Sequence, residues 1–224
     1  MQKRRVIVVW NDFYHRKEVL APAVDAVFDP AEWEVVRTEN ARDAVGAAAD
    51  LLILFAIGRP DGVPDLTLAE QEQVVHQVEE GMGILFFHAG MVLTGTNSPY
   101  LTKLNSGSFI SHPARKGNLY HAEQCQVTVT PLPNVPHPIT EGVEPFTELD
   151  EHYFVKMDVG TTRLLACATS EHGTTPAVWA HPYGQGRVAA ITEGHTVNTM
   201  ENPNMRRLLQ NAANWAARGS ELPE

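Results

Sequence analysis

Apolar residues in the first half of the chain alternate between the spacing of buried strands and the spacing of helices. The segments "RVIVVW" (5–10), "WEVVRT" (33–38) and "DLLILFAIG" (50–58) have strand character suited to a parallel sheet. Between the first two, apolar residues recur at helical spacing (Leu20, Val24, Val27 and Phe28), and Pro22 suits such a helix only near its first turn. This alternation predicts an α/β fold with a parallel sheet covered on both faces.

A second helix and a fourth strand follow. Thr67 and Glu70 have the spacing of a capping box, Gly81 lies where a helix C-cap belongs, and one apolar stripe runs between them (Val74, Val75 and Val78). The apolar run "ILFF" at 84–87 predicts a buried strand, and "HAG" at 88–90 predicts a sharp turn that leaves it. Four strands and their crossovers are therefore expected by residue 88.

The second half has shorter strand patterns. We expect "CQVTVTP", "TRLLACATS", "PAVWAH" and "GRVAAIT" to be mixed or antiparallel additions to the same sheet, and "YGQGRV" (183–188) to be a hairpin turn. The glycines of that turn are too few and wrongly spaced for a phosphate loop, so no nucleotide cofactor is expected. Asn202 and Pro203 predict the start of a last helix that Gly219 ends. Because no linker interrupts the pattern, residues 1–224 are interpreted as one domain.

The composition of the chain restricts the classes of molecule that it is expected to bind. The formal net charge of −10 argues against nucleic acid and against an anionic membrane surface, and small molecules become the expected partners. No apolar run approaches the roughly 20 residues needed to span a bilayer. The basic segment "QKRR" leads directly into a strand without a signal core, which predicts a cytoplasmic protein. Cys125 and Cys167 are isolated from each other and are interpreted as buried thiols. A homo-oligomer is expected only on general grounds.

Three histidines follow predicted strands directly. In an open parallel sheet, ligands bind at the carboxyl ends of the strands, and His15, His88 and His195 all fall there. His112 lies in the long segment after His88, and "ELDEHYF" supplies Glu151 and Tyr153. Imidazoles with a carboxylate could bind a divalent metal, with zinc the first choice, or could form an acid/base cluster. Each histidine taken singly could equally be a turn residue that bonds to the backbone.

Three further observations bear on the chemistry. Asp150 and Glu151 are adjacent, so in an extended segment they point to opposite faces, which argues against hydrolysis by paired carboxylates. Arg59, in the loop "IGRPDGVP", could orient a substrate or face solvent. Aromatic rings at Trp10, Phe13, Tyr14 and Tyr153 could stack on a sugar, although core packing is the more common role of such rings.

The motifs in their order resemble those of a known family. "VVWNDFYHRKE", "GMGILFFHAG", "GSFISHP", "HPITEGV" with "FTELDEHYF", "YGQGRVAAITEGH" and "NPNMRRLLQNAANWAA" together are similar to the ThuA-like (trehalose-utilisation) family. That family is a branch of the class I glutamine amidotransferase-like superfamily, so the resemblance implies a flavodoxin-like three-layer sandwich with a mostly parallel central sheet. In the amidotransferases the strand-to-helix elbow carries the nucleophilic cysteine. Here His88 stands at the matching position, which predicts that the chain has no glutaminase activity.

The resemblance also implies a carbohydrate-related role. We expect an enzyme that acts on a sugar or keto-sugar derivative by isomerase-type or lyase- or hydrolase-type acid/base chemistry, with help from a divalent metal if one binds. The expected catalytic residues are His88, His195 and Glu151, and the expected metal ligands are His15, His88 and His195. Asn11, Arg59, His112 and Tyr153 are expected to contact the substrate. The alternative is a noncatalytic sugar-binding or regulatory protein on the same scaffold.

Overall fold

The computed structural model describes residues 3–10, 12, 14–55, 66–92, 98–115, 118–160 and 162–217. A nine-stranded sheet forms the centre, with the strand order β2-β1-β3-β4-β13-β12-β11-β8-β9. Each neighbouring pair from β2 to β13 is parallel. The strands of this parallel half are β1 (Arg4–Val9), β2 (Trp33–Thr38), β3 (Leu51–Leu54), β4 (Gly83–Phe87) and β13 (Gly186–Ile191).

The other half of the sheet is antiparallel, so the whole sheet is mixed. Every neighbouring pair from β13 to β9 runs antiparallel. Its strands are β8 (Gln124–Pro131), β9 (Phe146–Glu151), β11 (Arg163–Ser170) and β12 (Gly173–Tyr183). The late strands predicted from the sequence therefore join the same sheet as antiparallel additions, except that "GRVAAIT" forms β13 and pairs in parallel with β4.

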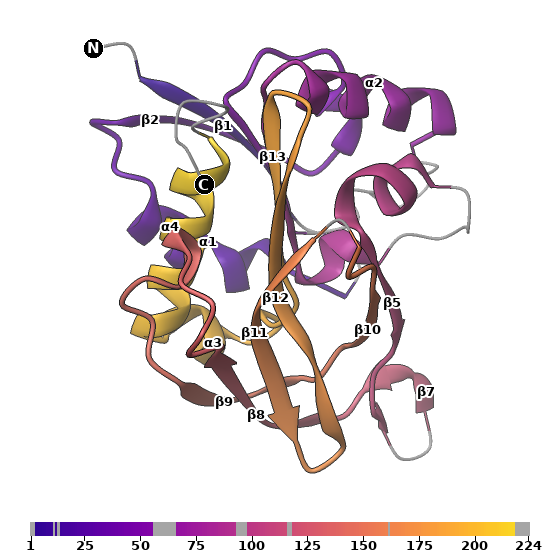
Figure 1. The fold of residues 1–224 in the computed structure, drawn as a ribbon, viewed down its shortest axis with the longest axis vertical. Helices are drawn as coiled ribbons and strands as arrows, with labels where there is room; N and C mark the ends of the chain where they lie inside the picture. The colour runs from indigo at the N-terminus through magenta and orange to yellow at the C-terminus, as the bar shows by residue number, and fades with distance from the viewer. Residues whose placement is uncertain are drawn as a thin grey trace.

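Helices cover both faces of this sheet (Figure 1). On one face, α1 (Lys17–Val27), α3 (Val197–Glu201) and α4 (Pro203–Ala216) bury residues such as Leu209 in one core cluster. On the other face, α2 (Leu68–Glu79) and η3 (Tyr100–Asn105) pack into a second cluster. Strand residues alternate between the clusters, as with Ile7 and Val8 of β1, because successive side chains of a strand point to opposite faces.

Most of the helix boundaries follow the sequence signals. The capping box of α2 is formed, with the Thr67 side chain accepting from the Glu70 N–H, and Asn202 caps α4. Pro22 differs from the expectation, because it lies inside α1, beyond the first turn, where it removes one helical N–H donor. The end of the third predicted strand (56–58) and Gly219 lie outside the described residues.

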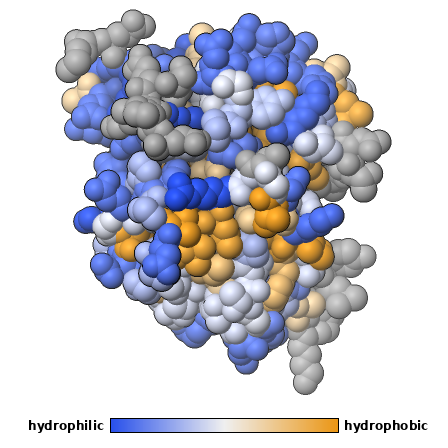
Figure 2. Space-filling model, in the orientation of Figure 1, coloured by the Kyte–Doolittle hydropathy of each residue, from blue (hydrophilic) through white to orange (hydrophobic). Residues whose placement is uncertain are grey.

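Smaller elements complete the chain. A two-stranded sheet pairs β5 (Gly107–Ser111) with β10 (Phe154–Met157), and another pairs β6 (Ala114–Arg115) with β7 (Asn118–Ala122). Single turns of helix are η1 (Ala41–Ala44), η2 (His88–Met91) and η4 (Pro138–Thr140). Among the described residues, no helix combines the length and the apolar character needed to cross a membrane. Figure 2 shows one face of the molecule, where hydrophilic residues surround an apolar area.

Candidate functional site

His88 directly follows β4, as the first residue of η2, in an unusual backbone conformation. Its φ of 43° lies in the left-handed region, which is uncommon for a residue other than glycine. Gly90, two residues later, lies so close to β3 that a Cβ atom would be 1.8 Å from the carbonyl oxygen of Leu54. The close contact of Gly90 with β3 and the positive φ hold His88 at the carboxyl end of the sheet, as in the strand-to-helix elbow of nucleophilic enzymes.

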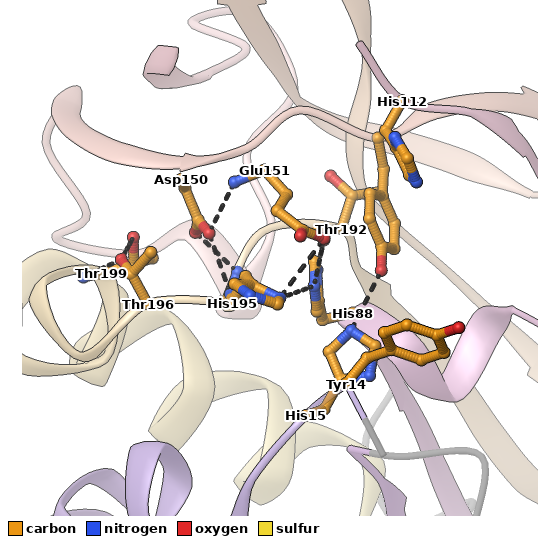
Figure 3. A network of polar contacts seen from close by, with 12 residues as sticks. Tyr14, His15, His88, His112, Asp150, Glu151, Thr192, His195, Thr196 and Thr199 are labelled. Carbon is orange, nitrogen blue, oxygen red and sulfur yellow. Dashed lines mark hydrogen bonds and ion pairs between the residues drawn. The ribbon is translucent and has the colours of Figure 1, made fainter. Parts of the chain in front are cut away.

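Four side chains from distant parts of the chain meet at this edge (Figure 3). His15 follows β1, His88 follows β4, Glu151 ends β9 and His195 follows β13. Each offers one ligand atom, and these atoms all lie within 4.8 Å of one another. The Glu151 carboxylate lies 3.3 Å from His195 Nδ1 and 3.6 Å from His88 Nε2.

The hydrogen bonds of His88 determine which of its nitrogens faces the cluster. Nδ1 lies 2.7 Å from the carbonyl oxygen of Thr192, and a carbonyl only accepts, so Nδ1 carries the hydrogen. Nε2 is then the basic nitrogen of the neutral ring, and it lies 3.4 Å from Nδ1 of His195. Two ring nitrogens that face each other at this distance need either a proton or a cation between them.

His15 is oriented by a carboxylate that the sequence analysis did not single out. Asp12 Oδ1 lies 2.9 Å from His15 Nδ1 and also accepts the backbone N–H groups of Tyr14 and His15. His15 Nε2 therefore faces the cluster, 3.4 Å from the hydroxyl of Tyr153. The Tyr153 ring is buried and stacks on His88 at a centroid distance of 4.1 Å. Tyr153 thus forms a wall of the site that contacts two of its imidazoles.

His195 is held mainly through its backbone. The N–H groups of Gly194 and His195 donate to the carboxylate of Asp150, at 2.9 and 3.0 Å. Gly194 has a φ of 140°, and a Cβ atom there would lie 2.1 Å from the ring of Phe87. Only glycine fits this position, and the turn therefore directs the His195 ring toward His88 and Glu151.

Burial and neighbouring charges together shift the pKa values of Glu151, His195 and His88. Burial raises the pKa of Glu151, but its hydrogen bond to His88 and the charges of His88, His195 and His15 outweigh burial and lower this pKa to about 2. Burial and the charge of His88 lower the pKa of His195 to about 4. Burial also lowers the pKa of His88, but Glu151 and the charge of Asp150 more than compensate, and the result is a raised pKa. At neutral pH, Glu151 is therefore ionised and His195 neutral.

The donor set fits a divalent metal ion. Three imidazoles and one carboxylate are ordinary zinc ligands. The second nitrogen of His15 is bonded to a carboxylate and that of His88 to a backbone carbonyl, which is how metal-binding imidazoles are usually fixed. Glu151 and His195 have the protonation states that a ligand needs at neutral pH, whereas the raised pKa of His88 opposes metal binding by this imidazole. His15, His88, Glu151 and His195 are thus the residues that could hold an ion.

The remaining predicted site residues are placed differently. His112, just after β5, lies beside the Tyr153 ring at a centroid distance of 6.4 Å, outside the four-residue cluster. Asn11 and Arg59 lie outside the described residues. Asp12 and Thr192 were not predicted as site residues, and Asp150 was considered only for hydrolysis by paired carboxylates. The contacts of Asp150 and Thr192 join segments far apart in the sequence, so only the folded chain creates them. A carboxylate three residues before His15 was the single available signal.

The chain matches the sequence model of one protein family and is similar to several solved structures. The sequence model of the family described as trehalose utilisation (ThuA) matches residues 5–216. A ThuA-like protein from Parabacteroides merdae is 16% identical, with a TM-score of 0.69, and the match covers 100% of this chain and 93% of that chain. A ThuA-like protein from Bacteroides uniformis is 18% identical, with a TM-score of 0.68 and coverage of 96% and 91%.

A third similar structure belongs to a larger protein. The β-galactosidase from Rahnella sp. R3 is 14% identical, with a TM-score of 0.62, and the match covers 96% of this chain and 31% of that chain. Comparison with curated proteins gave no match. At these identities the structural likenesses show the fold alone.

Proposed function

Because the chain belongs to the trehalose-utilisation (ThuA) family, we propose that it is a carbohydrate-related enzyme with a divalent metal site, acting on a sugar or keto-sugar derivative. The observation that carries this proposal is the convergence of four potential ligand atoms within 4.8 Å of one another. They belong to His15, His88, Glu151 and His195. We propose zinc as the first ion to test, because imidazole and carboxylate ligands suit it.

The chemistry we propose is a proton shift or elimination next to a carbonyl group. A divalent ion supplies Lewis acidity that polarises a carbonyl oxygen and stabilises the charge that develops there. In this proposal the ionised carboxylate of Glu151 and the imidazoles of His15, His88 and His195 would hold the ion. Asp12 keeps His15 in the tautomer that such a ligand requires.

We propose that residues around the cluster bind the sugar and move the proton. His112 Nδ1 lies 3.1 Å from the carbonyl oxygen of Pro113, so Nδ1 carries the hydrogen and Nε2 is the basic nitrogen. Tyr14 is 48% exposed and its ring lies next to His15, which gives a flat apolar surface for a sugar ring. His112 would then exchange the proton, while Tyr14 and Tyr153 position the substrate.

A metal-free form of the same chemistry rests on the protonation states. Glu151 lies 3.6 Å from His88 Nε2, and the raised pKa of His88 favours an ion pair between them. His195, with a pKa of about 4, would be the neutral base beside that pair. In this form His88 donates a proton and His195 accepts one. The noncatalytic alternative, a sugar-binding protein, uses the same exposed Tyr14 ring without turnover.

We propose that glutaminase activity is lost. A glutamyl thioester needs a cysteine thiolate at the elbow, where this chain has His88. The two cysteines of the chain lie on β8 and β11 in the antiparallel half, and burial raises the pKa of each thiol. We also propose a flavodoxin-like scaffold, which is supported by the order β2-β1-β3-β4-β13 in the parallel half.

Elemental analysis of the tag-free protein tests the metal site. We expect about one equivalent of divalent metal per chain, because the ligand set can be completed by one ion. His88→Asn and His195→Asn should lose that metal, whereas His76→Asn, which changes an exposed histidine on α2, should retain it. Absence of metal from the protein after addition of zinc, manganese and nickel in turn would refute the metal site and leave the metal-free form.

A turnover assay distinguishes an enzyme from a noncatalytic sugar-binding protein. Keto sugars and the corresponding disaccharides are assayed for isomerisation or cleavage with the protein and with His88→Asn. An enzyme should lose turnover in the variant while the ligand still binds, since Tyr14 and His112 are retained. A change in sugar affinity alone, with no turnover by either protein, would favour the noncatalytic alternative.

A further inference from the structure

Asp150 is a buried carboxylate beside the four-residue cluster, but its side chain does not point into it. It precedes Glu151 at the end of β9, and only 1% of it is exposed. Figure 3 shows its carboxylate turned toward the backbone of His195 and toward Thr199 of α3, on the side away from His88. Neighbouring residues of one strand thus face in different directions, Glu151 toward the imidazoles and Asp150 toward the backbone.

The carboxylate of Asp150 collects hydrogen bonds from two segments of the chain. Oδ1 accepts the N–H of Glu151 at 2.8 Å and that of His195 at 3.0 Å, and Oδ2 accepts the N–H of Gly194 at 2.9 Å. The hydroxyl of Thr199 also donates to it. The bonded segments are separated by more than 40 residues, so one side chain connects the end of β9 to the turn after β13.

We infer that Asp150 is the positioning residue that holds two of the four cluster residues, Glu151 and His195, in register with each other. This inference rests on the proposed metal site, which it extends to a residue outside the ligand set. His15 and His88 have their own supports in Asp12 and the Thr192 carbonyl. Glu151 and His195 share one support, because both of their N–H groups donate to the same Oδ1 atom. The Thr196 hydroxyl, which donates to the Leu149 carbonyl at 2.8 Å, links the same two segments through residues outside the four-residue cluster.

The amide of asparagine cannot replace this carboxylate. Asparagine offers one acceptor oxygen and an NH₂ group, whereas the three backbone N–H groups and the Thr199 hydroxyl that bond to Asp150 are donors. Whichever way the amide turns, its NH₂ group faces at least one backbone N–H, and the turn at Gly194 must move. Movement is restricted there, because Gly194 already packs against the Phe87 ring. His195 would consequently lose its position relative to Glu151.

The first test measures amide hydrogen exchange in the metal-free protein. In the native chain the N–H groups of Gly194, His195 and Glu151 are bonded and should exchange slowly. In Asp150→Asn we expect exchange at these amides to accelerate at least about tenfold, while amides of β1 and β4 keep their native rates. Native rates at all three amides in the variant would overturn the inference, whether or not the protein binds a metal.

The second test measures binding of cobalt(II) and zinc(II) to the full chain. Loss of an outer support typically weakens metal affinity by about 10- to 100-fold, and we expect this loss in Asp150→Asn together with an altered cobalt absorption spectrum. A merely structural role would lower thermal stability without changing that spectrum. Affinity within twofold of the native value, with an unchanged spectrum, would also overturn the inference.

Glu193→Gln is the matched control. Glu193 is equally buried and lies in the same turn, but it accepts a hydroxyl hydrogen from Thr192 at 2.5 Å and no N–H of a cluster residue in the described part of the chain. If Glu193→Gln and Asp150→Asn lose metal affinity and amide protection to the same extent, a specific role for Asp150 is overturned. If the native protein binds neither ion, the proposed metal site fails on its own, and the exchange rates still decide the role of Asp150.

Discussion

At the scale of single residues, the site depends on how each imidazole is fixed. His88 is fixed by a backbone carbonyl, His15 by a carboxylate and His195 by its own backbone. These supports decide which nitrogen of His15 and of His88 faces the cluster, and thereby make the lone pairs converge. A histidine without such a support could rotate, and its nitrogen would be lost to the site.

Asp12→Asn tests this reasoning at His15. The amide can still accept the Nδ1 hydrogen but carries no charge, so the imidazole becomes a weaker ligand. We expect the affinity for zinc to fall by about 10- to 100-fold, measured by competition with a chelator. His15→Asn, which removes the ligand itself, should cost more. An affinity of Asp12→Asn equal to the native value would show that the Asp12 to His15 contact does not tune the site.

At the scale of elements, two close contacts of glycine position the site. Gly90 lets the elbow after β4 approach β3, and Gly194 lets the turn after β13 pass over Phe87. Both contacts are made by backbone that has no room for a Cβ atom. The neighbouring parallel strands β4 and β13 thus bring His88 and His195 to the same edge of the sheet.

Gly194→Ala should therefore disturb both the fold and the site. The new Cβ would lie 2.1 Å from the Phe87 ring, and a φ of 140° is strained for alanine. We expect the free energy of unfolding to fall by at least about 2 kcal/mol, with loss of metal binding. Gly46→Ala is the control, because its φ of 72° is also left-handed but nothing lies within 4 Å of the new Cβ. In Gly46→Ala the free energy of unfolding should fall by only about 1 kcal/mol, and the variant should still bind metal. An equal fall in the free energy of unfolding in both variants would refute the steric argument.

At the scale of the whole molecule, buried histidines outside the site link stability to pH. His181 on β12 is buried, with Nδ1 2.8 Å from the Thr162 hydroxyl, and burial lowers its pKa to about 4. The unfolded chain binds a proton at this histidine near its ordinary pKa of about 6.5. Between these two values the unfolded state binds more protons than the folded state, so the free energy of unfolding falls as pH decreases.

His181→Gln should make stability less dependent on pH. Removal of one such group lowers the slope by at most about 1.4 kcal/mol per pH unit between roughly pH 4.5 and 6. Urea unfolding at several pH values measures this slope, and comparison of variants cancels contributions from other groups. His76→Gln, which removes an exposed histidine of α2, is the control that separates the loss of a buried histidine from the loss of any histidine. If the slope of the free energy of unfolding against pH is the same in His181→Gln as in the native protein, His181 is not a source of the pH dependence.

The sequence by itself determined the local elements and the candidates for the site. Hydrophobic periodicity predicted β1, β2, β4, α2 and α4 near their observed bounds, because spacing and capping residues act within a few positions of one another. Position after a predicted strand singled out His15, His88 and His195, and the structure brings these three together with Glu151. The family resemblance found in the motifs agrees with the match over residues 5–216.

Only the tertiary structure decided how those candidates are arranged. That β13 lies beside β4, that Glu151 faces the imidazoles and that Asp150 faces the backbone of His195 depend on pairings between segments far apart in the sequence. Such pairings follow from the packing of the complete sheet, which short-range patterns do not encode. The same is true of the nitrogens that converge at the site, because their direction is set by hydrogen bonds formed after the chain has folded.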